Sequence, residues 1–215
     1  ITSIDTASAY GEAEKIVGSF LQHTDRAALQ IVTKIRPNAL YSIAPGQYYR
    51  ALKQNLFASL TNLNLSYVDG CLFHNADYVN DEAALEALAQ LKQDGLVKKT
   101  GVSTYLPSEF EAAMRSPHVD LIQIPYNLLD TRLDHLLQQC DKEVHARSAF
   151  LQGLLLMDVS AVPKHLWDVK PYLHRLALFC EYNGVTRTQA ALAFVKMQPN
   201  ISKLVFGVDN MAQLK

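Results

Sequence analysis

Short apolar runs and amphipathic segments alternate along this chain without a break. The segments between the apolar runs, such as 48–65, 81–94 and 170–182, are predicted as helices, and in 48–65 apolar residues recur at a spacing of three to four. The apolar runs, predicted as strands, cover 1–4, 29–34, 68–74, 97–103, 119–125, 144–148 and 203–207. Strands joined through helices run parallel. The alternation therefore indicates a doubly wound sheet or a barrel.

The residues that close the predicted strands distinguish these two folds. They are Asp5, Lys34, His74, Ser103, Gln123, Ser148 and Gly207. In a (β/α)8 barrel the carboxyl ends of all strands meet around one pocket. A doubly wound dinucleotide-binding sheet shares a pocket only at its switch point and carries a G-x-G-x-x-G fingerprint, which this sequence lacks. We therefore expect an α/β fold, a (β/α)8 TIM barrel, with 1–215 as a single barrel domain.

The composition excludes several classes of partner. The chain has 215 residues and a formal net charge of -1, so a nucleic-acid-binding or anionic-membrane surface is not expected. It contains no run of about 18 apolar residues and no charged-then-apolar leader pattern, so we expect no membrane span and no export signal. Cys71, Cys140 and Cys180 lie far apart without a CxxC spacing, which favours reduced thiols in a cytoplasmic protein. We expect a small-molecule partner; the sequence does not predict an oligomeric state.

The first predicted strand leads into a polar turn and then a helix. Asp5 and Tyr10 both lie in this turn. On these residues alone, a helix cap for Asp5 and a packed aromatic ring for Tyr10 account for them as well as a catalytic role does. The side chains that follow the next two strands, Lys34 and His74, favour the catalytic interpretation. A chance meeting of these four residue types at three neighbouring strand ends is improbable.

These four side chains suit the protonation of a developing alkoxide. Tyrosine has a pKa of about 10 and is a poor proton donor at neutral pH. A neighbouring ammonium stabilises the phenolate, so Lys34 would make Tyr10 a usable general acid. Asp5 would hold Lys34, and His74 would orient a substrate oxygen. No side chain carries hydride, so carbonyl reduction requires a nicotinamide cofactor.

Two other chemistries find little support in the sequence. A metal site would have Asp5 and His74 as ligands, without a second histidine nearby and with Lys34 repelling the ion, so we expect no metal. A serine or cysteine nucleophile would require an elbow of the G-x-S-x-G type, and the sequence contains none.

Several segments, in order along nearly the whole chain, resemble the aldo/keto reductases. They are DTASAYGEAEKIVG at 5–18, TK at 33–34, FHN at 73–75, GVS at 101–103, QIPYN at 123–127 and RSAFLQGLL at 147–155. The resemblance implies a (β/α)8 barrel that reduces an aldehyde or ketone to an alcohol with NAD(P)H and without a metal. It implies Tyr10 as the proton donor, with Asp5, Lys34 and His74 around it.

The resemblance also implies a set of cofactor-binding residues. Ser103 and Gln123 correspond to residues that bind the nicotinamide carboxamide, and Arg147 stands where many members have a tyrosine on the nicotinamide. The others, in two loops expected at the pyrophosphate and at the adenosine phosphate, are Ser148, Phe150, Gly153, Gly207, Asp209 and Gln213. NADP is the expected cofactor. NAD is the alternative, because Asp209 is acidic where a 2′-phosphate requires a cation.

Three further expectations follow. The family's first strand and helix would precede Ile1 and most of its last helix would follow Lys215, so the barrel is expected to be truncated at both ends. A cofactor-binding regulatory or catalytically inert barrel of the same family is the alternative function. Finally, a helix expected over 131–140 leaves only 141–143 before the next strand, which suggests that residues are missing from this connection.

Overall fold

The fold is taken from a computed structural model, which describes residues 1–208 and 210–214. Its chain forms two compact units, one made of Ile1–Ile124 with Cys140–Glu143 and one made of Pro125–Gln139 with Val144–Lys215. The two units are described separately below. That 1–215 forms a single domain stays a prediction.

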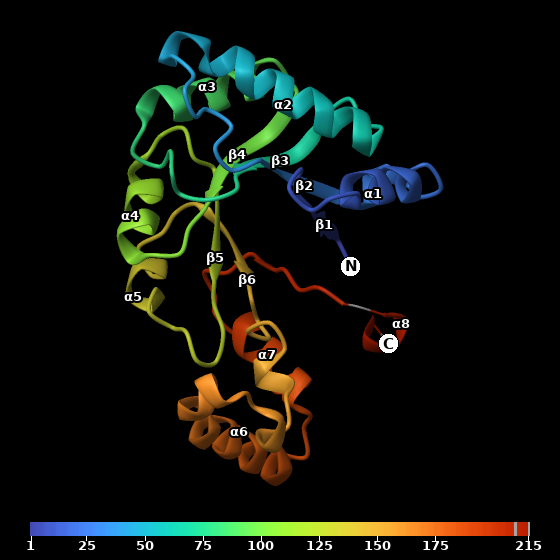
Figure 1. The fold of residues 1–215 in the computed structure, drawn as a ribbon, viewed down its shortest axis with the longest axis vertical. Coiled ribbons are helices and arrows are strands. Elements are labelled where there is room, and N and C mark those ends of the chain that lie inside the picture. Colours follow the sequence, from blue (N-terminus) through green and yellow to red (C-terminus); the bar gives the residue numbers. More distant parts are fainter. Residues whose placement is uncertain (209, 215) are drawn as a thin grey trace. The chain divides into compact units, whose positions relative to one another are not determined.

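The first unit contains the five strands that the sequence predicted for it. They are β1 (Ser3–Asp5), β2 (Gln30–Ile35), β3 (Val68–Phe73), β4 (Val97–Ser103) and β5 (Leu121–Pro125). Each pairs in parallel with the next strand along the chain. Four helices connect them, namely α1 (Ala13–Leu21), α2 (Tyr48–Leu63), α3 (Glu82–Gln93) and α4 (Pro107–Arg115). In Figure 1, α1, α2 and α3 lie together along these strands, with α2 packed on β2 and α3 on β4.

Local sequence signals set the limits of these helices. The Asp81 side chain accepts a hydrogen bond from the Ala84 backbone and caps α3. Past its other end, Gly95 adopts a left-handed φ of 74°. The apolar stripe of α2 ends at Leu63, two residues before the predicted end, because Asn64 takes a left-handed φ of 53°. The predicted helices therefore exist, and their ends shift by one or two residues.

The alternation of side chains along the strands places the polar strand ends inside the unit. Val32, Leu72 and Leu121 form a buried cluster on the inner face. Lys34 and Gln123 follow Val32 and Leu121 by two residues, so they point to the same face as those apolar residues. The inner face of the sheet is thus apolar in the middle of the strands and polar toward their carboxyl ends.

Asp69 anchors the opposite, amino-terminal end of the strands. Its carboxylate accepts hydrogen bonds from the Ile31 backbone at 2.8 Å, from Arg26 at 2.6 Å and from Lys98 at 2.9 Å. Burial raises the pKa of the Asp69 carboxyl, but these hydrogen bonds and the Arg26 charge outweigh burial and hold the pKa below its ordinary value. The ionised carboxylate therefore stabilises the fold.

We expect Asp69→Asn to lower the free energy of unfolding at pH 7 by about 2 kcal/mol, because it leaves Arg26 and Lys98 without their anion. The contribution of Asp69 is present above its unfolded pKa of about 3.9 and is lost as the pH falls through the lower folded pKa. Urea denaturation at several pH values should show the difference from wild type shrinking below about pH 4. The exposed Glu111, which pairs with Arg115, provides the control Glu111→Gln, expected within about 0.5 kcal/mol of wild type. An Asp69→Asn effect no larger than this would contradict the prediction.

The second unit contains two strands, four α-helices and three short 3₁₀ helices in its described residues. The strands β6 (Glu143–Arg147) and β7 (Lys203–Leu204) pair in parallel. The helices are α5 (Asp134–Leu137), α6 (Lys170–Asn183), α7 (Arg187–Lys196) and α8 (Met211–Leu214). The sequence separates α6 from α7 through Gly184, with a left-handed φ of 64°, and Thr186, which caps α7. The core between them contains Leu155, Leu173 and Ala191.

Two predicted elements of this unit are shorter than expected. The helix predicted over 131–140 is only α5, because Gln139 bonds to Leu136 in a tight last turn. The connection to β6 therefore spans residues 138–142, an ordinary length, and the reason for suspecting missing residues no longer holds. The last strand, predicted over 203–207, pairs with β6 only at Lys203 and Leu204.

Among residues 1–208 and 210–214, no helix has the length and apolar character needed to cross a membrane.

Candidate active site

An ion pair between two neighbouring strand ends lies at the centre of the candidate site. Asp5 is the last residue of β1, and Lys34 lies near the end of β2. The Lys34 ammonium pairs with Asp5 Oδ1 and donates a second hydrogen bond to the Thr6 carbonyl at 3.0 Å. The Lys34 side chain is only 2% exposed. A buried ammonium is costly without partners, so Asp5 and Thr6 explain how a lysine is accommodated here.

The Asp5 carboxylate is also held from β5. Gln123, which is 1% exposed, donates a hydrogen bond from Nε2 to Asp5 Oδ2 at 2.8 Å. One carboxylate oxygen thus contacts Lys34 and the other contacts Gln123. Two strands therefore fix the orientation of the Asp5 carboxylate, and with it the position of the ammonium.

Tyr10 and His74 complete the predicted group of four. The Lys34 ammonium lies 5.3 Å from the centroid of the Tyr10 ring. The rings of Tyr10 and His74 meet edge to face, with centroids 5.5 Å apart and an interplanar angle of 85°. Tyr10 is 49% exposed, so a molecule from solvent can reach it. The structure therefore brings Asp5, Tyr10, Lys34 and His74 together, as the sequence predicted.

Ser103 and Gln123 lie side by side on neighbouring strands. They are register partners, Ser103 as the last residue of β4 and Gln123 in the middle of β5, and both are buried. The Thr104 backbone donates to the Gln123 carbonyl at 2.8 Å, which continues the pairing past the strand end. A hydroxyl and a carboxamide together offer the donors and acceptors that an amide group requires. This donor set fits the carboxamide of a nicotinamide.

The loop that follows β6, in the second unit, has an unusual backbone. Ser148, Leu151, Gln152 and Gly153 all have left-handed φ values, of 61°, 48°, 54° and 86°. For the three non-glycine residues this conformation costs free energy, and such strain concentrates at ligand-binding loops. Asn127 donates to the Ser148 carbonyl at 3.2 Å, and Arg147 donates to the Ser148 hydroxyl at 3.3 Å. These bonds hold the start of the loop.

The other predicted cofactor segment of this unit lies beside that loop. The rings of Phe150 and Phe206 are 6.3 Å apart in an edge-to-face arrangement, so Phe150 lies next to the Gly207 segment. The backbone at Gly207 is open, since a Cβ there would meet no atom within 4 Å. Further along, the Asn210 side chain accepts from the Gln213 backbone at 3.1 Å. Asp209, also predicted to bind cofactor, lies outside the described residues.

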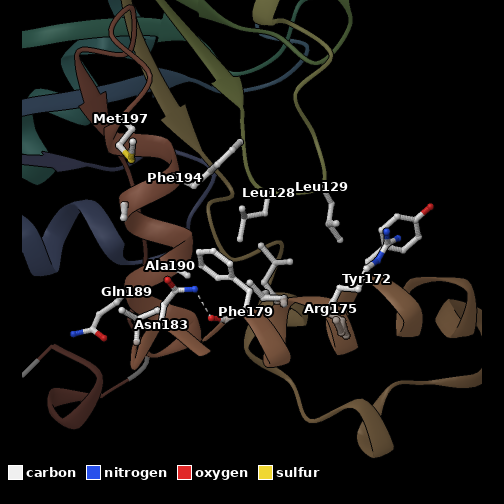
Figure 2. A pocket seen from close by; sticks show the side chains of 15 residues that line it. Leu128, Leu129, Tyr172, Arg175, Phe179, Asn183, Gln189, Ala190, Phe194 and Met197 are labelled. Carbon is white, nitrogen blue, oxygen red and sulfur yellow. Dashed lines mark hydrogen bonds between the residues drawn. The ribbon is translucent and has the colours of Figure 1, made fainter. Parts of the chain in front are cut away.

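A cavity of about 740 Å³ lies elsewhere in the second unit (Figure 2). Side chains of α6 and α7, with Leu128 and Leu129, form most of its wall. None of the sequence-predicted site residues lines this cavity. The candidate site is therefore defined by the strand ends and not by this cavity.

Sequence reasoning missed a layer of residues behind the site. Ser8 donates a side-chain hydrogen bond to the Lys34 carbonyl at 3.0 Å. Glu14 accepts one from Thr33 at 2.7 Å. The available signal was weak: Glu14 shares a helix face with Gly18 and Leu21, at a spacing that places all three inward. Within the described chain, no group of three or more His, Cys, Asp or Glu residues could hold a metal ion.

Comparison with known proteins gives consistent matches. Residues 1–215 match the sequence profile described as "Aldo/keto reductase family". A D-threo-aldose 1-dehydrogenase of a Pseudomonas species is 26% identical, over 98% of this chain and 76% of that protein. The holo structure of a Bacillus halodurans aldo-keto reductase has a TM-score of 0.82 and 22% identity, over 100% of this chain and 74% of that one. The structure of an aldo/keto reductase of Klebsiella pneumoniae in complex with NADP and acetate has a TM-score of 0.74 and 23% identity, over 96% of this chain and 70% of that one. These structures confirm the expected α/β fold of the (β/α)8 barrel class.

Proposed function

The chain belongs to the aldo/keto reductase family, and we propose that it reduces an aldehyde or a ketone to an alcohol with a nicotinamide cofactor. The contact of the buried Lys34–Asp5 pair with the exposed Tyr10 ring supports this function most directly. It sets a fixed positive charge beside a phenol that solvent-borne molecules can reach. A nearby positive charge makes a tyrosine a better proton donor to a substrate oxygen.

In the proposed reaction, Tyr10 donates the proton. When bound, the cofactor supplies hydride to the carbonyl carbon. The Tyr10 hydroxyl transfers its proton to the carbonyl oxygen, where negative charge develops. The Lys34 ammonium stabilises the resulting phenolate, and Asp5 keeps that ammonium in place. His74 orients the carbonyl oxygen, and the exposed Tyr10 regains a proton from water.

We propose NADP as the cofactor, with NAD as the alternative. Ser103 and Gln123 would hold the carboxamide, and Arg147, Ser148, Phe150 and Gly153 would lie at the nicotinamide and pyrophosphate. Gly207, Asp209 and Gln213 would lie at the adenosine phosphate. The Klebsiella relative of the same fold carries NADP, whereas the acidic Asp209 favours NAD.

Fluorescence titration with NADPH and NADH measures both dissociation constants. A preference for NADPH above about 100-fold would exclude NAD.

Steady-state oxidation of NADPH and NADH in the presence of aldehydes, ketones and aldoses tests the reductase function. Turnover of any carbonyl compound, with the matching alcohol as product, would support it. Binding of cofactor without turnover of any member of the panel would favour the alternative, a regulatory or catalytically inert barrel. Aldoses are included because the Pseudomonas relative is named for an aldose.

We expect His74→Ala to slow the reduction of unreactive ketones more than that of reactive aldehydes. The His74 ring contacts the Tyr10 ring edge to face, so its loss leaves the substrate oxygen and the phenol less well oriented. Reactive aldehydes tolerate imperfect orientation better because their intrinsic barrier is lower. Values of kcat/KM for a matched aldehyde and ketone pair measure this, and equal losses for both would contradict the orienting role.

A further inference from the structure

We infer that Glu14 is a positioning residue for carbonyl reduction, because it ties the segment that bears Tyr10 to the strand that bears Lys34. The inference rests on the proposed function and concerns the same site. Glu14 lies in the first turn of α1, four residues after Tyr10. It acts from the helix-covered side of β2, whereas Lys34 and Asp5 meet on the inner side.

Glu14 is a buried carboxylate, and each of its two oxygen atoms accepts a hydrogen bond. Glu14 is 2% exposed. Its Oε1 accepts a hydrogen bond from the Thr33 hydroxyl at 2.7 Å, and its Oε2 accepts one from the Asn62 amide at 3.3 Å. Removing a carboxylate from water is costly, and an apolar residue at this helix position would fill the space without that cost. The two hydrogen bonds are therefore what a carboxylate contributes at this position.

The partner of Glu14 is the immediate neighbour of the buried lysine. Thr33 is 1% exposed and pairs in register with the buried Cys71 of β3. Because side chains alternate along a strand, Thr33 faces the helices while Lys34 faces the interior. A hydrogen bond at Thr33 thus fixes the strand at the residue next to the ammonium.

The segment bearing Tyr10 is tied to β2 before the tyrosine by Ser8, whose hydroxyl donates to the Lys34 carbonyl, and after it by Glu14. The Tyr10 side chain is half exposed. The Ala13 backbone donates to the Tyr10 carbonyl at 3.1 Å, so the first turn of α1 determines where the tyrosine backbone lies. One turn further on, α1 packs tightly on α2, because a Cβ at Gly18 would come within 2.2 Å of the Asn62 carbonyl. Glu14 and Gly18 together fix α1, and the Glu14–Thr33 hydrogen bond ties its first turn to β2.

The experiment replaces the partner and not the catalytic group. Thr33→Val removes the hydroxyl at constant shape, and Thr33→Ser restores it. Thr100→Val is the matched control: Thr100 is fully buried on β4 and donates to the His118 carbonyl at 2.7 Å, outside the site. All variants are assayed well below their melting temperatures, and kcat, KM and the cofactor Kd are measured.

We expect Thr33→Val to lower kcat by about 10- to 100-fold, since small misplacements of reacting groups have effects of this size. The cofactor Kd should stay within about twofold of wild type, and Thr33→Ser should return kcat to within about threefold. Thr100→Val should lose stability but keep its kcat. In addition, Glu14→Ala with Thr33→Val should be no slower than Glu14→Ala alone, because both remove the same bond.

The outcomes separate this inference from the proposed function. A Thr33→Val variant with the kcat of Thr100→Val, beside an inactive Tyr10→Phe variant, would overturn the inference and leave the function intact. A Tyr10→Phe variant that still turns over would overturn the function instead. If Thr33→Val does not fold, Glu14→Leu takes its place: it has a similar size but offers no oxygen to accept the hydrogen bonds from Thr33 and Asn62. An unchanged kcat in Glu14→Leu would likewise overturn the inference.

Discussion

Tyr10→Phe is expected to abolish carbonyl reduction while leaving cofactor affinity nearly unchanged. The substitution removes only the hydroxyl, which is the proposed proton donor. It keeps the ring that lies 5.3 Å from the Lys34 ammonium and contacts the His74 ring. General acid catalysis contributes about 10²- to 10⁴-fold to rate. The expected loss in kcat is of this size, without the loss of structure that a smaller side chain would cause.

Stopped-flow or steady-state oxidation of NADPH measures kcat, and fluorescence titration measures the cofactor Kd in the same preparation. Tyr41→Phe is the control, because Tyr41 is a highly exposed tyrosine outside the proposed group. It should behave like wild type in both assays. A Tyr10→Phe variant that keeps more than a tenth of the wild-type kcat would show that another group donates the proton.

The meeting of Asp5, Lys34 and His74 could be predicted from the sequence because of the way βα units are built. Each of these residues follows an apolar run, and consecutive parallel strands bring their carboxyl ends to one edge. The number of residues that separate them along the chain does not affect this arrangement. Only the order of elements and the alternation of side chains are needed, and both are strong signals here.

The contacts behind that edge could not be predicted in the same way. A glutamate in the first turn of a helix usually points to solvent, where its negative charge interacts favourably with the positive end of the helix dipole. Glu14 is instead buried, and the reason lies in the tight packing at Gly18, which depends on the position of α2. Similarly, the resemblance assigns Gln123 to the cofactor, whereas its amide also contacts Asp5. Such contacts depend on the rotamer of each side chain and on the neighbouring element, whereas the sequence pattern indicates only which face of its own element a residue occupies.

The short α5 shows the limit of periodicity itself. Residues 131–140 have the composition of a helix, but only Asp134–Leu137 form one. The Asp130 side chain pairs with Arg132 at 2.7 Å just before it, and the chain turns again directly after Leu137. Local hydrogen bonds to side chains and a tight last turn compete with helix propagation in so short a segment.

Lys34→Met is expected to reduce kcat by at least about 100-fold and also to destabilise the protein. Two effects combine in this variant. The phenolate of Tyr10 loses the ammonium beside it, which slows proton transfer. Asp5, whose side chain is 11% exposed, keeps Gln123 but loses its counter-charge. Removing one partner of a buried ion pair costs about 3–5 kcal/mol, so urea denaturation should show a markedly lower free energy of unfolding.

The double variant Lys34→Met with Asp5→Asn separates these two effects. Replacing both charges removes the uncompensated carboxylate, and Asn can still accept the hydrogen bond from Gln123. Stability should therefore recover most of what the single variant lost, since neutral replacements of a buried pair are often well tolerated. The rate should not recover, because the ammonium beside Tyr10 is still absent. A double variant that regains the wild-type kcat along with its stability would mean that Lys34 supports the fold only, and that Tyr10 needs no neighbouring cation to act as an acid.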